Sequence, residues 1–429
     1  MVKPYNEWGL AEWLSDLETR NSQEIQLGLT RIQEVAQKLK LLSTECCVIT
    51  VAGTNGKGST VTALEHLYHA AGYQVGTYTS PHLLQFNERI RVDLTPISDQ
   101  DLCTAFCTIE AARGQIILTY FEMTTLAALW HFKHACLDLI ILEVGLGGRL
   151  DATNILDADL AIITTIDFDH QDFLGTTLEA IGYEKAGILR QGKPFIYADI
   201  NPPATIVEAA TQRSCSTYFL DKEYSFTEQK THWSIQCGEQ QLNNLPKPSI
   251  QLKSAAAAIM ATFLLARDLP VSYEQVCSAL RHIFIPGRLQ LQKGLVSILY
   301  DVSHNSQSAK LLANTLYSLD NKGTVHAVFS ALKDKDIGGL IEPLKDCVDQ
   351  WYPAQLDVKR AISANLLLSY FKKAEIFVEI CYNSPLVAFE TALNQAEPGD
   401  LIVVYGSFFT VGQVMAAKPN RRFDETGNR

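Results

Sequence analysis

The hydrophobic positions of this chain follow two alternating patterns. Short runs of consecutive apolar residues, as over 137–144, are typical of strands buried on both faces of a parallel sheet. Segments with apolar residues at positions i, i+3, i+4 and i+7 predict helices with one apolar face, the first at Leu10, Trp13, Leu14 and Leu17. Because the two kinds of segment alternate along the chain, the sequence predicts an α/β fold with a mostly parallel sheet, flanking helices and right-handed crossovers.

The predicted elements form two series. The first has strands over 48–52, 74–79, 137–144, 160–166 and 195–198, and helices over 26–41, 58–71, 98–112, 119–134, 178–189, 254–267 and 273–283. Between 217 and 250 the pattern becomes short, polar and β-like. After a break at Ile285-Pro286-Gly287-Arg288, the second series has strands over 296–302, 324–329, 375–379 and 401–405, and helices over 306–319, 361–371 and 385–395. We therefore predict one domain over residues 1–285 and a smaller, Rossmann-like α/β domain over 286–429.

One stretch combines the features of a phosphate site. The apolar run that ends at Ala52 is followed by Gly53-Thr54-Asn55-Gly56-Lys57-Gly58-Ser59-Thr60 and a predicted helix. Glycines let backbone N–H groups approach an anion, and the helix N-terminus and the lysine add positive charge. The match to G-x-x-x-x-G-K-[ST] is partial, because Val51 stands at the first glycine and Gly58 follows the lysine. A glycine-rich turn that binds nothing is the alternative.

Polar side chains follow other predicted strands at the edge where ligands bind in open α/β sheets. They are Ser80, Glu143, Asp169 and His170. A hydroxyl, a carboxylate and an imidazole suit a Mg²⁺ ion that keeps several waters. Each residue also has an ordinary structural interpretation: a turn serine, a carboxylate beside a helix N-terminus and a hydrogen-bonded histidine.

The second series contains a further candidate in Asp301-Val302-Ser303-His304-Asn305, between a strand and a helix. A carboxylate at this position is suited to ribose hydroxyls. A simple helix cap by Ser303 or Asn305 is the alternative. Gly406-Ser407-Phe408, after the last strand, is compatible with a plain turn.

Composition narrows the class of protein. The 429 residues are 47% hydrophobic and 19% charged, with a net charge of −11, which argues against disorder and against a surface for nucleic acid or acidic membranes. The N-terminus has no signal-peptide core, and the longest apolar run, 255–266, is too short to span a bilayer. The ten cysteines include no C-x-x-C pair. We predict a cytoplasmic protein with reduced, buried thiols.

Together these motifs resemble the folylpolyglutamate synthase and dihydrofolate synthase family of the Mur-ligase superfamily. The similarity covers nearly the whole chain, in VAGTNGKGST, YTSPHL, LTYFEMTTLAAL, LEVGLGGRLDATN, the Asp169-His170 step, EKAGI, PGR, DVSHN, DKD and GSF. The resemblance implies a P-loop-type, Mur-ligase-like first domain and an ATP-dependent amide ligase. In such a ligase ATP phosphorylates a carboxylate, and the amine of L-glutamate attacks the acyl phosphate.

The resemblance also implies roles for individual residues. ATP would be held by Thr54, Asn55, Gly56, Lys57, Gly58, Ser59, Ser254, Arg288, Asp301 and His304. Ser80, Glu143 and His170 would bind the metal, directly or through water, and the catalytic residues would be Lys57, Lys185 and His170. Lys185 matches a lysine that the family carbamylates, which would allow two Mg²⁺ ions, and K⁺ is a further candidate cation.

Three segments resemble the dihydropteroate site of the bifunctional bacterial enzymes. They comprise Glu24, Ile25, Gln26 and Leu27; Thr119, Tyr120, Phe121 and Glu122; and Leu150, Asp151 and Ala152. We therefore expect a bifunctional enzyme acting on dihydropteroate and on folates such as tetrahydrofolate. The chain departs from the family at Gln26 (usually Asp), Ser254 (Asn), Ser303 (Ala), Ser306 (Pro) and Phe409 (His). None of these changes removes a phosphate or metal group.

Three other functions stay open from the sequence. They are a folylpolyglutamate synthase without the first activity, a Mur-type ligase for a cell-wall precursor, and a nucleotide-binding module without catalysis. The partners expected for the favoured function are small molecules only, with no nucleic acid and no membrane, and the protein is expected to be a monomer.

Overall fold

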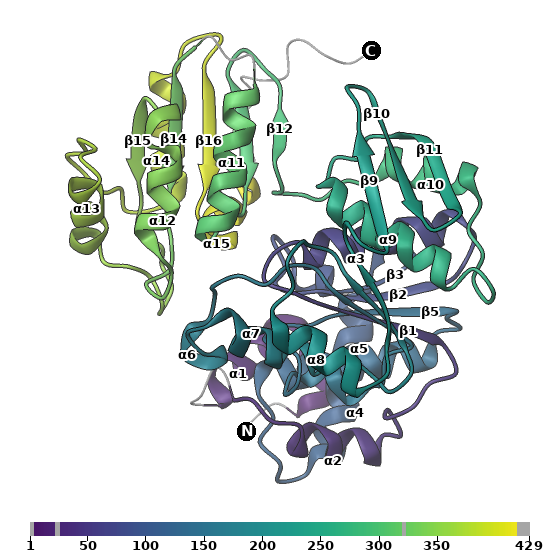
Figure 1. Cartoon of the computed structure of the whole chain (residues 1–429). Helices are drawn as coiled ribbons and strands as arrows, with labels where there is room; N and C mark the ends of the chain where they lie inside the picture. Colours follow the sequence, from purple (N-terminus) through teal and green to yellow (C-terminus); the bar gives the residue numbers. More distant parts are fainter. Residues whose placement is uncertain (1–3, 22–25, 320–322, 418–429) are drawn as a thin grey trace. The chain divides into compact units, whose positions relative to one another are not determined.

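The computed structural model describes residues 4–21, 26–319 and 323–417 (Figure 1). Residue contacts divide the chain into two compact units. Unit 1 comprises residues 1–82 and 87–284, and unit 2 comprises 83–86 and 285–429. The main break, after Phe284, lies next to the predicted boundary at 285/286. The short stretch 83–86 is an unpredicted part of unit 2.

Unit 1 is built on an eight-stranded sheet in the order β4-β3-β2-β5-β1-β6-β7-β8. Its strands are β1 (Cys47–Ala52), β2 (Val75–Tyr78), β3 (Ile90–Val92), β4 (Thr95–Pro96), β5 (Leu139–Glu143), β6 (Leu160–Ile163), β7 (Pro194–Tyr197) and β8 (Ser216–Phe219). The pairs from β2 to β8 are parallel, and β3 and β4 add an antiparallel edge. Because β1 lies between β5 and β6, the carboxyl ends of these three strands meet at one edge.

Helices cover both faces of this sheet. They are α1 (Leu10–Arg20), α2 (Thr30–Lys38), α3 (Lys57–Ala70), α4 (Asp99–Arg113), α5 (Tyr120–His134), α6 (Gln171–Leu174), α7 (Leu178–Ala186), α8 (Ala204–Gln212), α9 (Leu252–Leu264) and α10 (Tyr273–His282). The short 3₁₀ helices are η1 (Tyr5–Glu7), η2 (Phe86–Arg89) and η3 (Ala152–Ile155). Alternate strand residues point to opposite faces, so Ile162 joins the core with α3, α9 and α10, whereas Ala161 and Ile163 join the core with α7 and α8.

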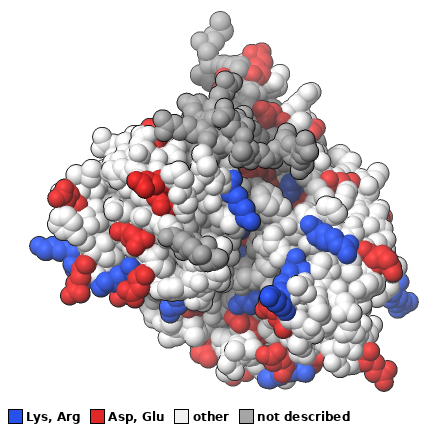
Figure 2. Space-filling model, turned by 90° about the horizontal axis from the view of Figure 1, so that it is seen from above, with Lys and Arg blue, Asp and Glu red and all other residues white. Residues whose placement is uncertain are grey.

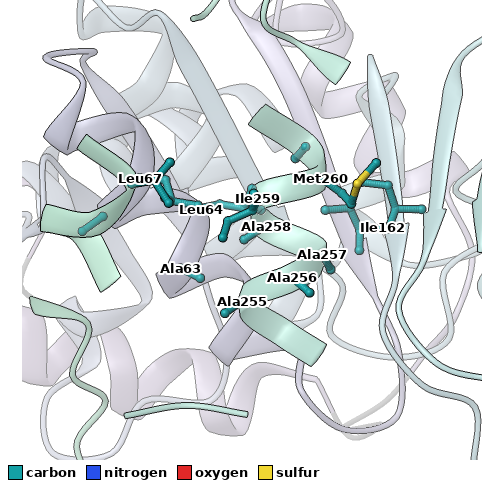
Figure 3. Packing of buried hydrophobic residues seen from close by; sticks show 14 of the residues in the cluster. Ala63, Leu64, Leu67, Ile162, Ala255, Ala256, Ala257, Ala258, Ile259 and Met260 are labelled. Atoms are coloured by element: carbon teal, nitrogen blue, oxygen red, sulfur yellow. The ribbon is translucent and has the colours of Figure 1, made fainter. Parts of the chain in front are cut away.

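The helix that follows the glycine-rich loop, α3, packs against a second helix that is rich in small residues. Figure 3 shows Ala63, Leu64 and Leu67 of α3 packed with the fully buried run from Ala255 to Met260 of α9. Four consecutive alanines let the two helix backbones approach closely, and a helix that is apolar all round is a core helix. Helix α3 therefore packs against both α9 and the strands of the sheet.

A small antiparallel sheet, in the order β11-β10-β9, covers the outer side of this core. Its strands are β9 (Tyr224–Glu228), β10 (His232–Cys237) and β11 (Gln240–Pro246), which confirms the β-like pattern predicted over 217–250. Trp233 is completely buried, and its indole N–H donates to the carbonyl oxygen of Pro246 at 3.0 Å.

Unit 2 has a five-stranded sheet in the order β12-β13-β16-β14-β15. The strands are β12 (Gln290–Gln292), β13 (Ser297–Asp301), β14 (Val325–Phe329), β15 (Gln350–Pro353) and β16 (Leu401–Tyr405), of which only β12 pairs antiparallel. The helices are α11 (Ser306–Ser318), α12 (Ile337–Ile341), η4 (Glu342–Cys347), α13 (Ala364–Lys373), α14 (Pro385–Gln395) and α15 (Phe408–Ala416). One face packs on α11, α12 and α13, and the other on α14 and α15. The α/β class is confirmed in both units.

Some elements differ from the prediction. No strand forms over 375–379: Ile376 and Val378 pack against the core, Phe377 is 87% exposed, and the edge position beside β14 belongs to β15 instead. The pattern missed β15 because its four residues end in a proline, which normally argues against a strand. Helix α2 begins at Thr30 rather than 26, and Ser407 caps α15 instead of closing a plain turn.

The remaining predictions from composition concern the cysteines, membrane-spanning helices and surface charge. All ten cysteines are free thiols, but only Cys277 is buried and Cys136 is exposed, so the prediction of buried thiols is wrong. Within the described residues, no helix is both long and apolar enough to cross a membrane.

On the face in Figure 2, Lys and Arg side chains lie singly or in small groups among Asp and Glu.

Candidate functional site

The predicted phosphate loop connects β1 to α3. Gly53 and Gly56 have φ values of +149° and +84°, which side-chain-bearing residues rarely adopt. Gly56 is the N-cap of α3, and the helix begins at Lys57, one residue earlier than predicted. The first-turn N–H groups of any helix lack partners inside the helix, so the start of α3 provides donors and a positive dipole end for an anion.

Two threonines that directly follow β6 hold this loop in place. The Thr54 N–H donates to the carbonyl oxygen of Thr165 at 2.8 Å, and the Asn55 N–H donates to its hydroxyl at 3.0 Å. The Thr164 hydroxyl donates to the carbonyl oxygen of Asn55 at 2.6 Å. The apolar pattern predicts a strand through Ile166, so it treats Thr164 and Thr165 as ordinary strand residues. Both are polar residues at the carboxyl end of a predicted strand, and this position would have identified them as candidates.

The contact between Gly53 and Thr164 leads to a stability prediction. A Cβ on Gly53 would lie 1.8 Å from the Thr164 hydroxyl oxygen. We expect Gly53→Ala to lower the free energy of unfolding by about 3 kcal/mol, from overpacking together with the positive φ. Gly28→Ala is the matched control, because Gly28 has φ +135° and nothing within 4 Å of the added Cβ. Urea denaturation should show a clearly smaller loss for the control, and equal losses would contradict the steric explanation.

Two lysine ammonium groups converge on the loop. The Lys57 ammonium donates to the carbonyl oxygens of Gly53 and Thr54 at 2.9 and 3.1 Å. The Lys185 ammonium, from α7, donates to the same Gly53 oxygen at 2.9 Å. The structure therefore brings together two of the three predicted catalytic side chains, although they are far apart in the sequence.

This arrangement changes the proton affinity of one of them. Lys185 is only 4% exposed, and its pKa falls to about 7. Burial is the largest cause, and the positive charge of Lys57 is the next, whereas the carboxylates of Asp169 and Asp151 oppose the shift. The lowered pKa favours the uncharged, nucleophilic amine form of Lys185.

A buried carboxylate faces the start of α3 from the neighbouring strand. Glu143 is the last residue of β5, it pairs in register with Val51 of β1, and it is 4% exposed. Its Oε2 accepts the Ser80 backbone N–H at 2.9 Å. A Cβ on Gly58 would lie 3.7 Å from its Oε1, so the carboxylate lies beside the first turn of α3. Ser80 and Glu143 are thus brought together as predicted.

His170 lies at the N-cap of α6 with φ +50°. Its backbone N–H donates to Asp169 at 2.9 Å, and its Nε2 is 3.9 Å from the other oxygen of that carboxylate. Among the described residues, no group of three or more His, Cys, Asp or Glu side chains is arranged to hold a metal ion. The hydroxyl and carboxylate oxygens of Ser80 and Glu143 nonetheless have the chemistry that Mg²⁺ prefers, with waters completing the shell.

Two of the three predicted pterin segments meet at Arg31, and the third is linked to this region by Gly28. Glu122 and Thr119 form a capping box at the start of α5, with hydrogen bonds of 2.8 and 3.1 Å. The Arg31 guanidinium pairs with Glu122 at 3.0 Å and donates to the Gln26 carbonyl oxygen at 2.8 Å. The Gly28 N–H reaches the carbonyl oxygen of Leu150 at 3.4 Å. Arg31 joins two of the segments and was not predicted, while Glu24 and Ile25 lie outside the described residues.

Aromatic rings and a buried carboxylate also belong to the predicted pterin segments or lie beside them. Phe121 lies 5.8 Å from the ring of Tyr78, and the Arg89 guanidinium lies 5.5 Å above the ring of Tyr120. Asp151 is the N-cap of η3, and burial raises its pKa, although hydrogen bonds from the protein oppose the shift. Its carboxylate accepts the backbone N–H groups of Leu146 and Thr153 at 2.8 and 3.0 Å, so it stabilises the glycine-rich loop that follows β5.

In unit 2 the predicted nucleotide residues gather beside Phe408. The Arg288 guanidinium lies 5.3 Å from the Phe408 ring, and the His304 ring lies 6.1 Å from it. Asp301 is buried at the end of β13, where it accepts the backbone N–H groups of Leu289 and Ser303 at 2.8 and 2.9 Å. Burial raises the pKa of Asp301, and the charge of Arg288 opposes this shift.

The alternative interpretation of the Asp301–Asn305 stretch is also partly confirmed. Asn305 is the N-cap of α11 and accepts the Ser308 N–H at 3.0 Å. In unit 1, Ser254 is buried, and its hydroxyl oxygen would lie 3.3 Å from a Cβ on Gly56. Ser254 therefore lies beside the phosphate loop.

Family models match both units. The Mur ligase middle domain matches residues 51–258, and the Mur ligase glutamate ligase domain matches residues 287–408. The dihydrofolate synthase/folylpolyglutamate synthase of Escherichia coli K12 is 42% identical over 413 residues, which cover 96% of each chain. The chain belongs to the dihydrofolate synthase/folylpolyglutamate synthase family of Mur ligases.

Solved structures of this family have the same fold. FolC of Escherichia coli in complex with DHPP and ADP has a TM-score of 0.92 at 41% identity, covering 97% of this chain and 99% of that one. A bifunctional folylpolyglutamate synthase/dihydrofolate synthase with Mn, AMPPNP and L-glutamate bound has a TM-score of 0.91 at 42% identity, with the same coverage. Members of the family that resemble this chain closely therefore bind a nucleotide, a divalent metal and glutamate, and the resemblance seen in the motifs is confirmed.

Proposed function

We propose that this protein is an ATP-dependent ligase that joins L-glutamate to dihydropteroate, forming dihydrofolate, and then to folates. The observation that carries the proposal is the loop between β1 and α3, where Lys57, Lys185 and Glu143 surround one helix N-terminus. The helix dipole and the Lys57 ammonium at one point suit a nucleotide triphosphate. The family membership and the ligands named for its solved members support the same conclusion.

The chemistry divides into two steps that these residues can support. A carboxylate oxygen of the acceptor attacks the γ-phosphorus of ATP, the bond to the bridging oxygen breaks, and ADP leaves. The amine of L-glutamate then attacks the acyl carbon, phosphate leaves, and the nitrogen loses a proton. Lys57 and the start of α3 would stabilise negative charge on the transferring phosphoryl group, and the protein holds these donors in place before the reaction.

We further propose that Mg²⁺ is bound by Ser80, Glu143 and His170, directly or through water. When bound, it would supply positive charge to the ATP phosphates. In unit 2, Arg288, Asp301 and His304 are proposed to contact the nucleotide. The segments around Gln26, Thr119–Glu122 and Leu150–Ala152 are proposed to bind the pterin, with Arg31 orienting Glu122. A bound K⁺, a monomeric state and a location in the cytoplasm stay predictions.

A second candidate function has one specific observation in its favour. Gln26 is neutral where the bifunctional enzymes usually carry Asp, and its backbone carbonyl oxygen is bound by Arg31. Loss of a carboxylate that meets the pterin would weaken the first activity and leave a folylpolyglutamate synthase only.

ADP release from the purified protein, with ATP, Mg²⁺ and L-glutamate, tests both candidates. Release with dihydropteroate and with tetrahydrofolate supports the bifunctional enzyme. Release with tetrahydrofolate alone supports the second candidate, and Gln26→Asp should then restore turnover of dihydropteroate. Release with neither acceptor would contradict the proposal and redirect attention to a cell-wall acceptor or to a non-catalytic module.

We also propose that Lys185 is carbamylated. Its amine nitrogen would attack the carbon of CO₂ and lose a proton, which needs the neutral form that a pKa of about 7 provides. A carbamate would turn the cation into an anion suited to a second Mg²⁺. With ¹³C-bicarbonate, we expect a carbamate carbon signal in NMR that grows as the pH rises from 6 to 8. Lys185→Met should remove the signal and Lys193→Met should keep it; a protein without any Lys185-dependent signal at pH 8 would contradict the proposal.

A further inference from the structure

The stretch Leu83–Phe86 belongs to unit 2, although the residues on both sides of it belong to unit 1. The chain therefore passes between the units three times, after His82, after Phe86 and after Phe284. The first two passages lie two and six residues after Ser80, the proposed metal-binding hydroxyl. This connection gives the C-terminal unit a covalent link to the metal site that is separate from the main domain boundary.

Leu83 anchors this stretch in the core of unit 2. Its side chain packs against the apolar cluster formed by β13, β16, α14 and α15. A Cβ on Gly287 would lie 3.0 Å from Leu83 Cδ2, and 3.3 Å from both Val302 and Val411. These three side chains leave little room for a Cβ at Gly287. Its φ of +70° independently favours glycine.

A second glycine admits the backbone of Leu83. Gly412 lies in the middle of α15, where glycine is an unfavourable helix residue. A Cβ at this position would lie 2.6 Å from the carbonyl oxygen of Leu83, closer than such atoms approach. Gly287 and Gly412 together form what we call the Leu83 slot, which accepts both the side chain and the carbonyl group of one leucine.

The slot is connected to the metal site by a short and stiff piece of chain. Ser80 precedes Leu83 by three residues, which span at most about 10 Å, and Pro81 restricts the path between them. At one end the Ser80 N–H is held by Glu143 at 2.9 Å. At the other end the slot includes Gly287, which directly precedes Arg288, the proposed nucleotide contact. Because the connecting stretch is so short, the position of Leu83 limits where Ser80 can lie.

We propose that Leu83, held in this slot, is a positioning residue that sets Ser80 for metal binding. The inference rests on the proposed function, because it takes Ser80 and Glu143 as metal ligands. Leu83 itself touches no reacting group in this scheme, and its effect passes through the two residues between it and Ser80, Pro81 and His82.

The test measures metal binding directly. Free Mn²⁺ is followed by electron paramagnetic resonance in the presence of AMPPNP, for the wild type, Gly412→Ala and Leu83→Ala. Changing the support of a ligand typically weakens metal affinity by 10–100-fold, so we expect about a tenfold loss of Mn²⁺ affinity in both variants. Because the two changes remove the same anchor, the double variant should lose little more than either single variant.

Gly338→Ala is the matched control, since Gly338 also lies in a helix of unit 2 and its added Cβ would meet only Asp336, at 3.7 Å. It should bind Mn²⁺ like the wild type. Folded Leu83→Ala protein with unchanged Mn²⁺ affinity would overturn the proposal, even where Gly412→Ala is unstable. A wild-type protein that binds no Mn²⁺ with AMPPNP would instead contradict the proposed function, so the two failures are distinguishable.

Discussion

Lys57→Ala is expected to lower glutamate-dependent ADP release by roughly 10³-fold while leaving the fold intact. The Lys57 ammonium is held at the start of α3 by the carbonyl oxygens of Gly53 and Thr54. It is therefore positioned before the reaction for the charge that develops on the transferring phosphoryl group. Alanine removes this charge and keeps the loop glycines, so the loss should appear in the rate rather than in stability.

A surface lysine provides the comparison for this variant. Lys193 is about half exposed, with its side chain 48% accessible, and pairs with Asp159 at 2.8 Å, an interaction of the kind that contributes little. Lys193→Ala should release ADP at the wild-type rate, with both variants giving wild-type circular-dichroism spectra. Lys57→Ala protein that turns over normally would remove Lys57 from the site.

Glu143→Ala is expected to abolish ADP release to a similar extent, and Glu143→Gln should separate the two roles of this carboxylate. In the wild type, Glu143 accepts the Ser80 N–H and supplies a negative charge beside the first turn of α3. Glutamine keeps an acceptor for Ser80 but loses the charge that a divalent cation requires. We expect Glu143→Gln to weaken Mn²⁺ binding by at least about 100-fold, with thermal stability close to that of the wild type.

The stability measurement distinguishes a metal ligand from a structural acid. Glu228→Gln is the control, because Glu228 lies on the edge strand β9 and pairs with Lys247 on the surface. It should bind Mn²⁺ normally. If Glu143→Gln also bound Mn²⁺ normally in the presence of AMPPNP, Glu143 would have only the task of holding Ser80.

The fold class could be predicted from the sequence because its signals are local. The apolar run that ends at Glu143 and the helix start after Gly56 each lie within a few neighbouring residues, and both were placed to within one or two positions. The strand wrongly expected over 375–379 shows the limit of this information. Its alternating pattern packs Ile376 and Val378 inward, but whether a segment joins a sheet depends on which edge is still open, and β15 takes that edge.

The residues of the candidate site also fall into two groups, those that the sequence identifies and those that only the tertiary structure reveals. The sequence by itself determined which chemical groups follow the strands: the loop glycines, Lys57, Ser80, Glu143 and His170. These residues stand out because a polar group directly after a buried strand is conspicuous in a linear pattern. The predicted residues of unit 2 stand out for the same reason, since Asp301 ends a strand and a helix follows it.

Only the tertiary structure decided how these groups are supported. Thr164 and Thr165 hold the phosphate loop because β6 lies beside β1, and Lys185 loses proton affinity because α7 brings it to the carbonyl group that also binds Lys57. Arg31 and Leu83 have no local signal at all. Their partners Glu122, Gly287 and Gly412 are more than eighty residues away in the sequence. Such contacts follow from strand order and close backbone approach, which periodicity along a chain does not record.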